Sequence, residues 1–184
     1  MTKKDLFFVE DYEINPYTMM IKPAANNDPR FLSEIFEMNG RYLSSDSPFD
    51  IVRRSCEYFG SSFNGRRQGT KQLIGITHKA PIIVDPHTSI FLFPTASPTS
   101  PHCIWISHDY VASHERNGSD ETIVTFQNNE SHKLPVSFYS FENQLSRTAM
   151  LRIKFMQNMK RMENFGRLIH NQASEQKGPY RIGK

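Results

Sequence analysis

The sequence contains little cysteine and no long apolar segment. Two cysteines among 184 residues exclude the dense disulfide framework of small secreted domains. No run of roughly 18 apolar residues occurs, so no membrane-spanning helix is predicted. The lysines near the N-terminus lead into only a short apolar run over residues 6–9, which does not fit a signal peptide. These absences predict a cytoplasmic protein with reduced thiols.

Apolar residues are also scarce, at 38% of the chain, but large aromatic residues compensate for this. The 14 phenylalanines and 7 tyrosines each bury a large area, so a packed core is expected over most of the length. The chain length predicts one domain, over residues 1–165. Residues 166–184 are polar and include Gly178-Pro179 and Gly183, so we expect a flexible basic tail there.

The net charge of +3 conceals a strong segregation of charge along the chain. Residues 53–79 carry six basic side chains against Glu57 alone, and residues 147–184 carry nine against two acidic ones. Residues 80–146, between them, carry two basic and seven acidic side chains. Two basic segments indicate a polyanion-binding face if folding brings them together. From charge alone, a solvated helix and tail over 147–184 explains the second segment slightly better.

Short strands are predicted along most of the chain, from apolar runs bounded by turn residues. Asn39-Gly40 is the strongest hairpin signal, and Asn15-Pro16 is expected to join an opening hairpin. The predicted strands cover residues 6–12, 17–22, 33–38, 41–44, 72–78, 82–84, 89–93, 103–111, 122–126 and a short return strand ending at 134–135.

Two helices are predicted, one early and one late. The early helix covers about 48–59, with Ser47 as N-cap, Pro48 at the first helical position and Gly60 at its end. The late helix covers about 140–165, with Ser140 as N-cap. Its expected buried row is Leu145, Ala149, Ile153 and Met156, and its basic stripe is Arg147, Lys154 and Arg161 with Asn143 and Asn158. The predicted fold is α+β, with a mainly antiparallel β-sheet, one early helix and a late basic amphipathic helix.

The segment 60–70 contains three glycines, three hydroxyl residues, Asn64 and the pair Arg66-Arg67. As an exposed loop, it would let the backbone approach a polyanion closely and offer guanidinium groups to phosphate or to a narrow minor groove. Phe63 is expected to anchor the loop to the core. An ordinary exposed turn is the alternative interpretation. The spacing does not match a nucleotide-binding P-loop.

Catalytic and metal chemistry receive little support from the sequence. The one possible metal set is Cys56, His78, Cys103 and His108, but structural zinc sites usually have two close pairs of ligands. Two buried cysteines and two hydrogen-bonded histidines are the favoured interpretation. No known catalytic motif occurs, so neither an enzyme nor a cofactor is predicted.

Four segments together resemble the ComK family, in order and at matching spacing over roughly residues 50–155. These segments are 54–70, 78–95 (with His78-Lys79-Ala80-Pro81 and Ile90-Phe91-Leu92-Phe93-Pro94-Thr95), Trp105-Ile106-Ser107-His108, and 134–149 (with Leu134-Pro135-Val136-Ser137 and Ser140-Phe141-Glu142-Asn143-Gln144).

The resemblance implies a transcriptional activator of competence genes for DNA uptake. Members of the family bind AT-rich promoter boxes through the minor groove, as dimers that pair into tetramers on DNA, without a catalytic cofactor. The resemblance also implies RNA polymerase and a proteolytic adaptor as protein partners. The expected DNA contacts are Asn64, Arg66, Arg67, Lys71, Lys79, Asn143, Arg147 and Lys154. The alternative is a regulatory protein whose basic face binds an acidic protein partner.

Overall fold

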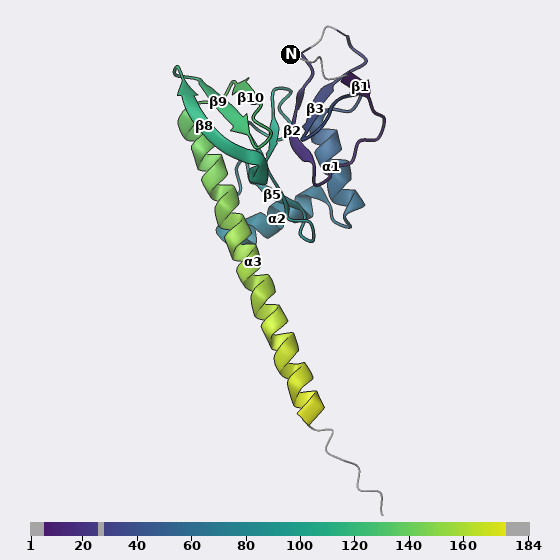
Figure 1. The fold of residues 1–184 in the computed structure, drawn as a ribbon, viewed down its shortest axis with the longest axis vertical. Coiled ribbons are helices and arrows are strands. Elements are labelled where there is room, and N and C mark those ends of the chain that lie inside the picture. The colour runs from purple at the N-terminus through teal and green to yellow at the C-terminus, as the bar shows by residue number, and fades with distance from the viewer. Residues whose placement is uncertain (1–5, 26–27, 176–184) are drawn as a thin grey trace, which may run out of the picture.

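The computed structural model describes residues 6–25 and 28–175. Its α+β architecture, with a mainly antiparallel sheet and a long late helix, confirms the predicted fold class (Figure 1). In chain order the elements are β1 (Leu6–Phe8), β2 (Thr18–Pro23), β3 (Ser33–Glu37), β4 (Arg41–Ser44), α1 (Pro48–Tyr58), α2 (Phe63–Ile74), β5 (Ile82–Asp85), β6 (Ile90–Pro94), β7 (Trp105–Ser107), a 3₁₀ turn (His108–Tyr110), β8 (Val111–Asn117), β9 (Glu121–Phe126), β10 (Ser131–Leu134) and α3 (Phe138–Glu175).

The strands form two sheets. The larger has seven strands in the order β1-β4-β3-β2-β7-β6-β5, and the smaller has three in the order β10-β9-β8. All pairs are antiparallel except β1 with β4. The hairpin predicted at Asn39-Gly40 is confirmed, since β3 and β4 pair on either side of it.

The opening hairpin predicted at Asn15-Pro16 is wrong. β1 pairs in parallel with β4 at the edge of the sheet rather than with β2. Between β1 and β2 the chain crosses to α1, where the Ile14 amide donates to the Ser55 hydroxyl at 3.0 Å. Ile14 is buried there. Because these residues pack into the core, they cannot turn back directly alongside β1.

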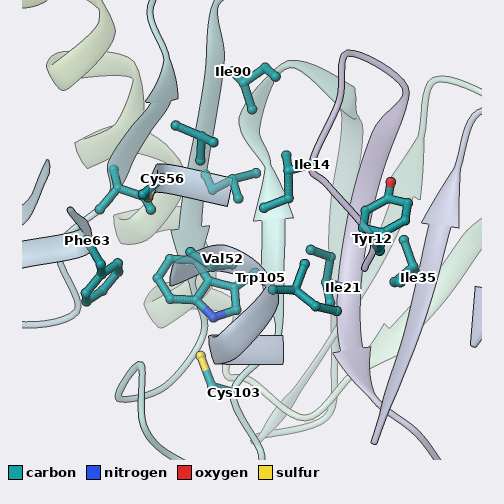
Figure 2. Packing of buried hydrophobic residues seen from close by; sticks show 14 residues of the cluster. Tyr12, Ile14, Ile21, Ile35, Val52, Cys56, Phe63, Ile90, Cys103 and Trp105 are labelled. Atoms are coloured by element: carbon teal, nitrogen blue, oxygen red, sulfur yellow. The ribbon is translucent and has the colours of Figure 1, made fainter. Parts of the chain in front are cut away.

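The seven-stranded sheet is covered on both faces, and its side chains alternate between them. On one face, α1 and α2 contribute Val52 and Phe63 to a core cluster that includes Trp105 (Figure 2). On the other, the three-stranded sheet and Phe141 of α3 pack against a second cluster that includes Ile106. Trp105 and Ile106 are neighbours in β7 and therefore face opposite layers.

Two predicted strands differ from those observed. Residues 72–74 form the end of α2, and the chain from 75 to 81 is a loop. The predicted strand over 103–111 is interrupted by the 3₁₀ turn, after which β8 begins at Val111. β8 was not predicted, because it lies at an edge of its sheet and buries none of its side chains fully. Its sequence therefore lacks the alternation that marks a half-buried strand.

The ends of α1 were predicted more accurately than those of α3. α1 begins and ends close to the predicted bounds, and the Ser47 hydroxyl accepts a hydrogen bond from the Asp50 amide at its N-terminus. α3 begins earlier, because Ser137 rather than Ser140 lies at its N-terminus, and the Ser137 hydroxyl accepts from the Ser140 amide at 3.4 Å. α3 also continues through Gly166 to Glu175, so residues 166–175 are helical rather than a flexible tail. Residues 176–184 of the predicted tail lie outside the described residues.

The buried face of α3 is not the predicted one. Ile153 and Met156 are exposed by 56% and 47%. The side chains that face the body are Phe141, Gln144, Thr148, Leu151 and, in part, Phe155. Two of these are polar, and a search for apolar residues at helical spacing therefore selected a row on another face of the helix.

Candidate nucleic-acid interface

The segment predicted as an exposed glycine-rich loop is mostly the helix α2. The Ser62 hydroxyl accepts a hydrogen bond from the Gly65 amide at 3.0 Å and caps its N-terminus. Gly75 ends the helix in a left-handed conformation with φ of 73°. Glycine adopts that conformation without a steric penalty, as is common at helix ends.

Tertiary burial explains why α2 forms despite the two glycines in its interior. Phe63 and Thr70 are buried, two turns apart on one face, and the Thr70 hydroxyl donates to the Pro81 carbonyl at 2.7 Å. Leu73 and Ile74 pack against a cluster that includes Leu151 of α3. Most helical stability in proteins comes from such packing rather than from propensity. The glycines and arginines had suggested a loop, and the Ser62 cap was the signal that could have identified the helix.

The exposed face of α2 is basic and polar. Asn64, Arg67, Gln68 and Lys71 recur at spacings of three and four residues, so they lie on one side of the helix, and together with Thr77 they line a shallow hollow. No acidic residue occurs in the sequence from 58 to 84. Three of the predicted DNA contacts, Asn64, Arg67 and Lys71, therefore share this face.

A second hollow connects α2 to the loop that follows it. Asn64 and Arg67 line it together with Lys79, and Phe49 and Phe63 lie against each other within it, with ring centroids 5.0 Å apart. The Arg67 guanidinium lies 6.0 Å from the centre of the Phe63 ring. Among the described residues, no carboxylate pairs with Arg67, Lys71 or Lys79. These cations therefore remain available to an external anion.

Gln144 connects this basic surface to α3. Its side-chain amide is buried and donates to the carbonyls of Lys79, at 2.9 Å, and Pro94, at 2.7 Å. Its amide oxygen accepts from Arg147 at 3.3 Å. The two basic segments of the sequence thus meet where α3 passes the loop that carries Lys79. Gln144 lies in a segment that carries the family resemblance, but it was not among the predicted site residues, because the burial of its amide between two carbonyls is not evident from the sequence.

Arg66 is oriented differently from its neighbour Arg67. Its guanidinium donates to the Phe59 carbonyl at 3.3 Å, near the end of α1, and its Nε atom is buried. It also lies near enough to Cys56 to affect that thiol electrostatically. Arg66 therefore connects α1 to α2, whereas Arg67 faces solvent.

The remaining predicted contacts, Asn143 and Lys154, lie on the same side of α3 as Arg147. Both are exposed, and neither lines the hollows beside α2. They extend the basic side of the helix away from the surface formed by α2.

Two arginines from the basic segments are used within the fold instead. Arg54 forms ion pairs with Asp46, at 2.8 Å, and more distantly with Asp11 and Glu13. Arg152 pairs with Asp109 and lies 5.8 Å from the centre of the Phe91 ring. The charge count along the sequence therefore overstated the free positive charge.

The residues considered as a metal set do not come together. Among the side chains that the structure describes, in residues 6–25 and 28–168, no group of three or more His, Cys, Asp or Glu could hold a metal ion. Cys56 and Cys103 are both buried, and burial raises the pKa of each thiol to about 11. His108 lies beside Asp109, with its Nδ1 atom 3.1 Å from the carboxylate. Over the same residues, no helix has the length and apolar character needed to cross a bilayer.

Comparison with known proteins assigns the chain to a family. The family model described as ComK protein matches residues 9–160. The chain is also 45% identical to the competence transcription factor of Bacillus subtilis (strain 168) over 155 residues, which cover 84% of this chain and 80% of that protein. No solved structure matches the chain significantly. The family match spans α1, α2, every strand except β1, and the first half of α3. The chain belongs to the ComK family.

Proposed function

We propose that this protein is a transcriptional activator of competence genes that binds AT-rich double-stranded DNA. The observation that carries the proposal is the grouping of Asn64, Arg67, Lys71 and Lys79 around two adjoining hollows, with Arg147 connected through Gln144. Unpaired cations, amides and exposed backbone in one surface are the groups that bind phosphate. The name of the relative, a competence transcription factor, supports the same conclusion.

The helical conformation of α2 limits how this surface can engage DNA. An α-helix with its side chains is about 10–12 Å wide, whereas the minor groove of B-DNA is about 6 Å wide. The body of α2 therefore lies across the phosphate backbones, and only extended side chains enter the groove. Arg67, which projects from the exposed face of α2, is the arginine assigned to that role. Arg66 is assigned a structural role, because its guanidinium is held against the end of α1.

The remaining parts of the proposal follow the family. We expect the protein to act in the cytoplasm as a homodimer or tetramer on promoter DNA, to contact RNA polymerase, and to be controlled by a proteolytic adaptor. Phosphate contacts by Lys71, Lys79, Arg147 and Lys154, with Asn143, provide most of the affinity and make it depend on salt. Arg67, with Asn64, provides the preference for A·T pairs, where a narrow groove concentrates negative potential.

A gel-shift titration with AT-rich and GC-rich duplexes at physiological salt tests the proposal. The wild type is expected to prefer the AT-rich duplex. Arg67→Ala is expected to lose about ten- to a hundredfold in affinity for it and to lose most of the preference, because removal of a base-reading arginine costs about 1–3 kcal/mol. Lys154→Ala is expected to weaken binding to both duplexes alike and to reduce the salt slope by about one.

Arg53→Ala is the matched control for the loss of one exposed arginine. Arg53 is half exposed on α1 and is already paired with Asp50 and Glu57, so its removal should leave DNA affinity within about twofold. A folded Arg67→Ala protein with wild-type affinity for the AT-rich duplex would overturn the site assignment. If the wild type retards neither duplex, the alternative function, binding to an acidic protein partner, replaces the proposal.

A further inference from the structure

The β6–β7 loop, residues 95–104, lies beside the basic face of α2. Residues 97–99 of this loop line the same hollow as Asn64, Arg67 and Lys79. The hollow has a volume of about 250 Å³, whereas a water molecule in the liquid occupies about 30 Å³. It therefore has room for a group much larger than a water molecule, such as a phosphate with part of its sugar. None of the DNA contacts in the proposed function comes from this loop.

The two hollows beside α2 share a common border. Asn64, Arg67 and Thr77 line both of them. Lys71, on the exposed face of α2, lines only one hollow. The β6–β7 loop and Lys79 line only the other. Asn64 and Arg67 therefore lie at the centre of the surface, with Lys71 on one flank and the β6–β7 loop on the opposite flank.

The chemistry of the β6–β7 loop suits an anion. No acidic residue occurs in the sequence between Asp85 and Asp109, so no carboxylate of the loop would repel one. Ser97 and Thr99 are exposed, and within the described part of the chain neither hydroxyl makes a hydrogen bond. Serine and threonine hydroxyls commonly donate to DNA phosphates. Two hydroxyls with free hydrogen-bonding capacity thus face a hollow that contains unpaired cations.

Hydrogen bonds of the main chain hold the β6–β7 loop in one conformation. The Ser100 amide donates to the Ser97 carbonyl at 2.8 Å, and the Cys103 amide donates to the Ser100 carbonyl at 3.0 Å. At the base of the loop, the Thr95 amide donates to the Ile104 carbonyl at 2.9 Å, and the Ile104 amide donates to the Thr95 hydroxyl at 3.1 Å. Because the loop is already ordered, binding of a ligand costs it little conformational entropy.

We propose that Ser97 and Thr99 bind the phosphate backbone of one DNA strand, that Lys71 binds the backbone of the other strand, and that Arg67 enters the minor groove between them. A minor groove is bordered by one backbone on each side, about 6 Å apart. The surface has the corresponding arrangement, since Arg67 lies between two flanks that each offer phosphate ligands. This inference rests on the proposed function and adds to it the side of the groove that each strand occupies.

Contacts on both strands explain how one arginine can be positioned over the groove. Phosphate contacts carry no sequence information directly, but they fix the orientation of a protein on the duplex. With Lys71 as the only flank, the protein could rotate about the backbone that it binds. A second contact at the β6–β7 loop prevents this rotation and holds Arg67 over the centre of the groove.

Ethylation interference on an AT-rich duplex tests the arrangement, because an ethylated phosphate no longer accepts the contact that the protein makes with it. Within one AT-rich box, the wild type is expected to show interfering phosphates on both strands, across one minor groove. The double variant Ser97→Ala/Thr99→Ala is expected to lose the interference on one strand, and Lys71→Ala on the opposite strand. Loss on the same strand for both proteins would overturn the proposal.

Gel-shift titrations with the same duplex measure the contribution of the loop. Ser97→Ala/Thr99→Ala is expected to lose about tenfold in affinity, because it removes two hydrogen bonds to charged groups. It should leave the salt slope unchanged, since no cation is removed, whereas Lys71→Ala should reduce the slope by about one.

A charge in the loop gives a larger effect and a matched control. Thr99→Glu is expected to lose at least about a hundredfold in affinity, because its carboxylate would face a phosphate. Ser119→Glu adds the same charge at an exposed hydroxyl residue between β8 and β9, which lines neither hollow, and is expected to change the affinity by less than about threefold.

The outcomes separate this inference from the proposed function. If the wild type and Thr99→Glu bind the AT-rich duplex equally well while Arg67→Ala binds weakly, the contact by the loop is overturned and the proposed function stands. If the wild type retards no duplex, both are overturned. The loop variants are expected to keep the wild-type Tm, because Ser97 and Thr99 are exposed. A loss of DNA binding by a variant with the wild-type Tm therefore reports on the contact and not on folding.

Discussion

Gln144 is the side chain on which the geometry of the basic surface depends most directly. Its amide satisfies two carbonyl groups from separate segments, at Lys79 and Pro94, while its oxygen accepts from Arg147. A buried amide left without partners costs about 1–3 kcal/mol, so this position accommodates few other residues. Gln144 thereby joins the loop after α2 to the start of α3. Its hydrogen bonds add to the apolar packing of α2 against α3 in holding the two basic segments of the sequence next to each other.

His132 is expected to make the stability of the protein depend on pH. Its ring lies 4.7 Å from that of Phe36 and 5.7 Å from that of Phe126. Burial, together with the nearby Lys22, lowers the pKa of His132 below the usual 6.5. Because the unfolded chain then binds a proton more readily than the folded one, stability is lost as the pH falls below about 6.5 towards the folded pKa.

Thermal unfolding between pH 7.5 and 5.5 measures this effect. His132→Phe removes the titrating group while keeping a ring in the site, so its Tm should fall less than that of the wild type as the pH is lowered. His87→Gln removes an exposed histidine and should follow the wild type. If the Tm of the wild type and that of His132→Phe decrease by the same amount between pH 7.5 and 5.5, His132 is not the group responsible.

Among the secondary-structure elements, α2 is the helix whose sequence is least typical of a helix, because it contains two glycines. Gly69 lies in its interior, and an added Cβ would meet no atom within 4 Å. Gly69→Ala is therefore expected to raise the free energy of unfolding by about 0.5–1 kcal/mol, because alanine is the better helix former. Gly75→Ala should lower it by about 1 kcal/mol, since Gly75 has φ of 73°. Urea unfolding measures the free energy of unfolding of both variants and of the wild type. A lower value for Gly69→Ala than for the wild type would argue that residue 69 is not in a helix.

The elements that were predicted correctly are those specified by nearby residues. Ser47 and Pro48 mark the start of α1 locally, and Asn39-Gly40 joins two strands that are adjacent in sequence. β1 could not be placed in this way, because its partner β4 lies more than thirty residues away. α2 was missed because the burial of its apolar side outweighs the weak helix propensity of its glycines.

The candidate site was predictable in composition but not in geometry. Charge and resemblance identified Arg67, Lys71 and Lys79, which the structure groups beside two hollows. They could not distinguish Arg67 from Arg66, whose orientation depends on the position of Phe59 at the end of α1. Whether these side chains contact DNA stays a prediction.

For the whole molecule, the division of α3 into a packed half and a projecting half predicts that the body folds without the projection. A chain that ends after Gln157 loses side chains that are exposed as far as Leu168. Its free energy of unfolding should stay within about 1 kcal/mol of the wild-type value, measured by urea unfolding at a concentration where both proteins are monomers. A loss of several kcal/mol would mean that the projection contributes to the core.

The absence of a break in α3 has a geometric consequence for any assembly built on it. Each residue added to an α-helix advances it by about 1.5 Å and rotates it by about 100°. Length and rotation are therefore coupled: one inserted residue near position 157 would rotate the far end of the helix by about 100° relative to the body. Seven inserted residues would nearly restore the phase and lengthen the arm by about 10 Å. The uninterrupted helix thus fixes both the distance and the rotational orientation of its far end relative to the body.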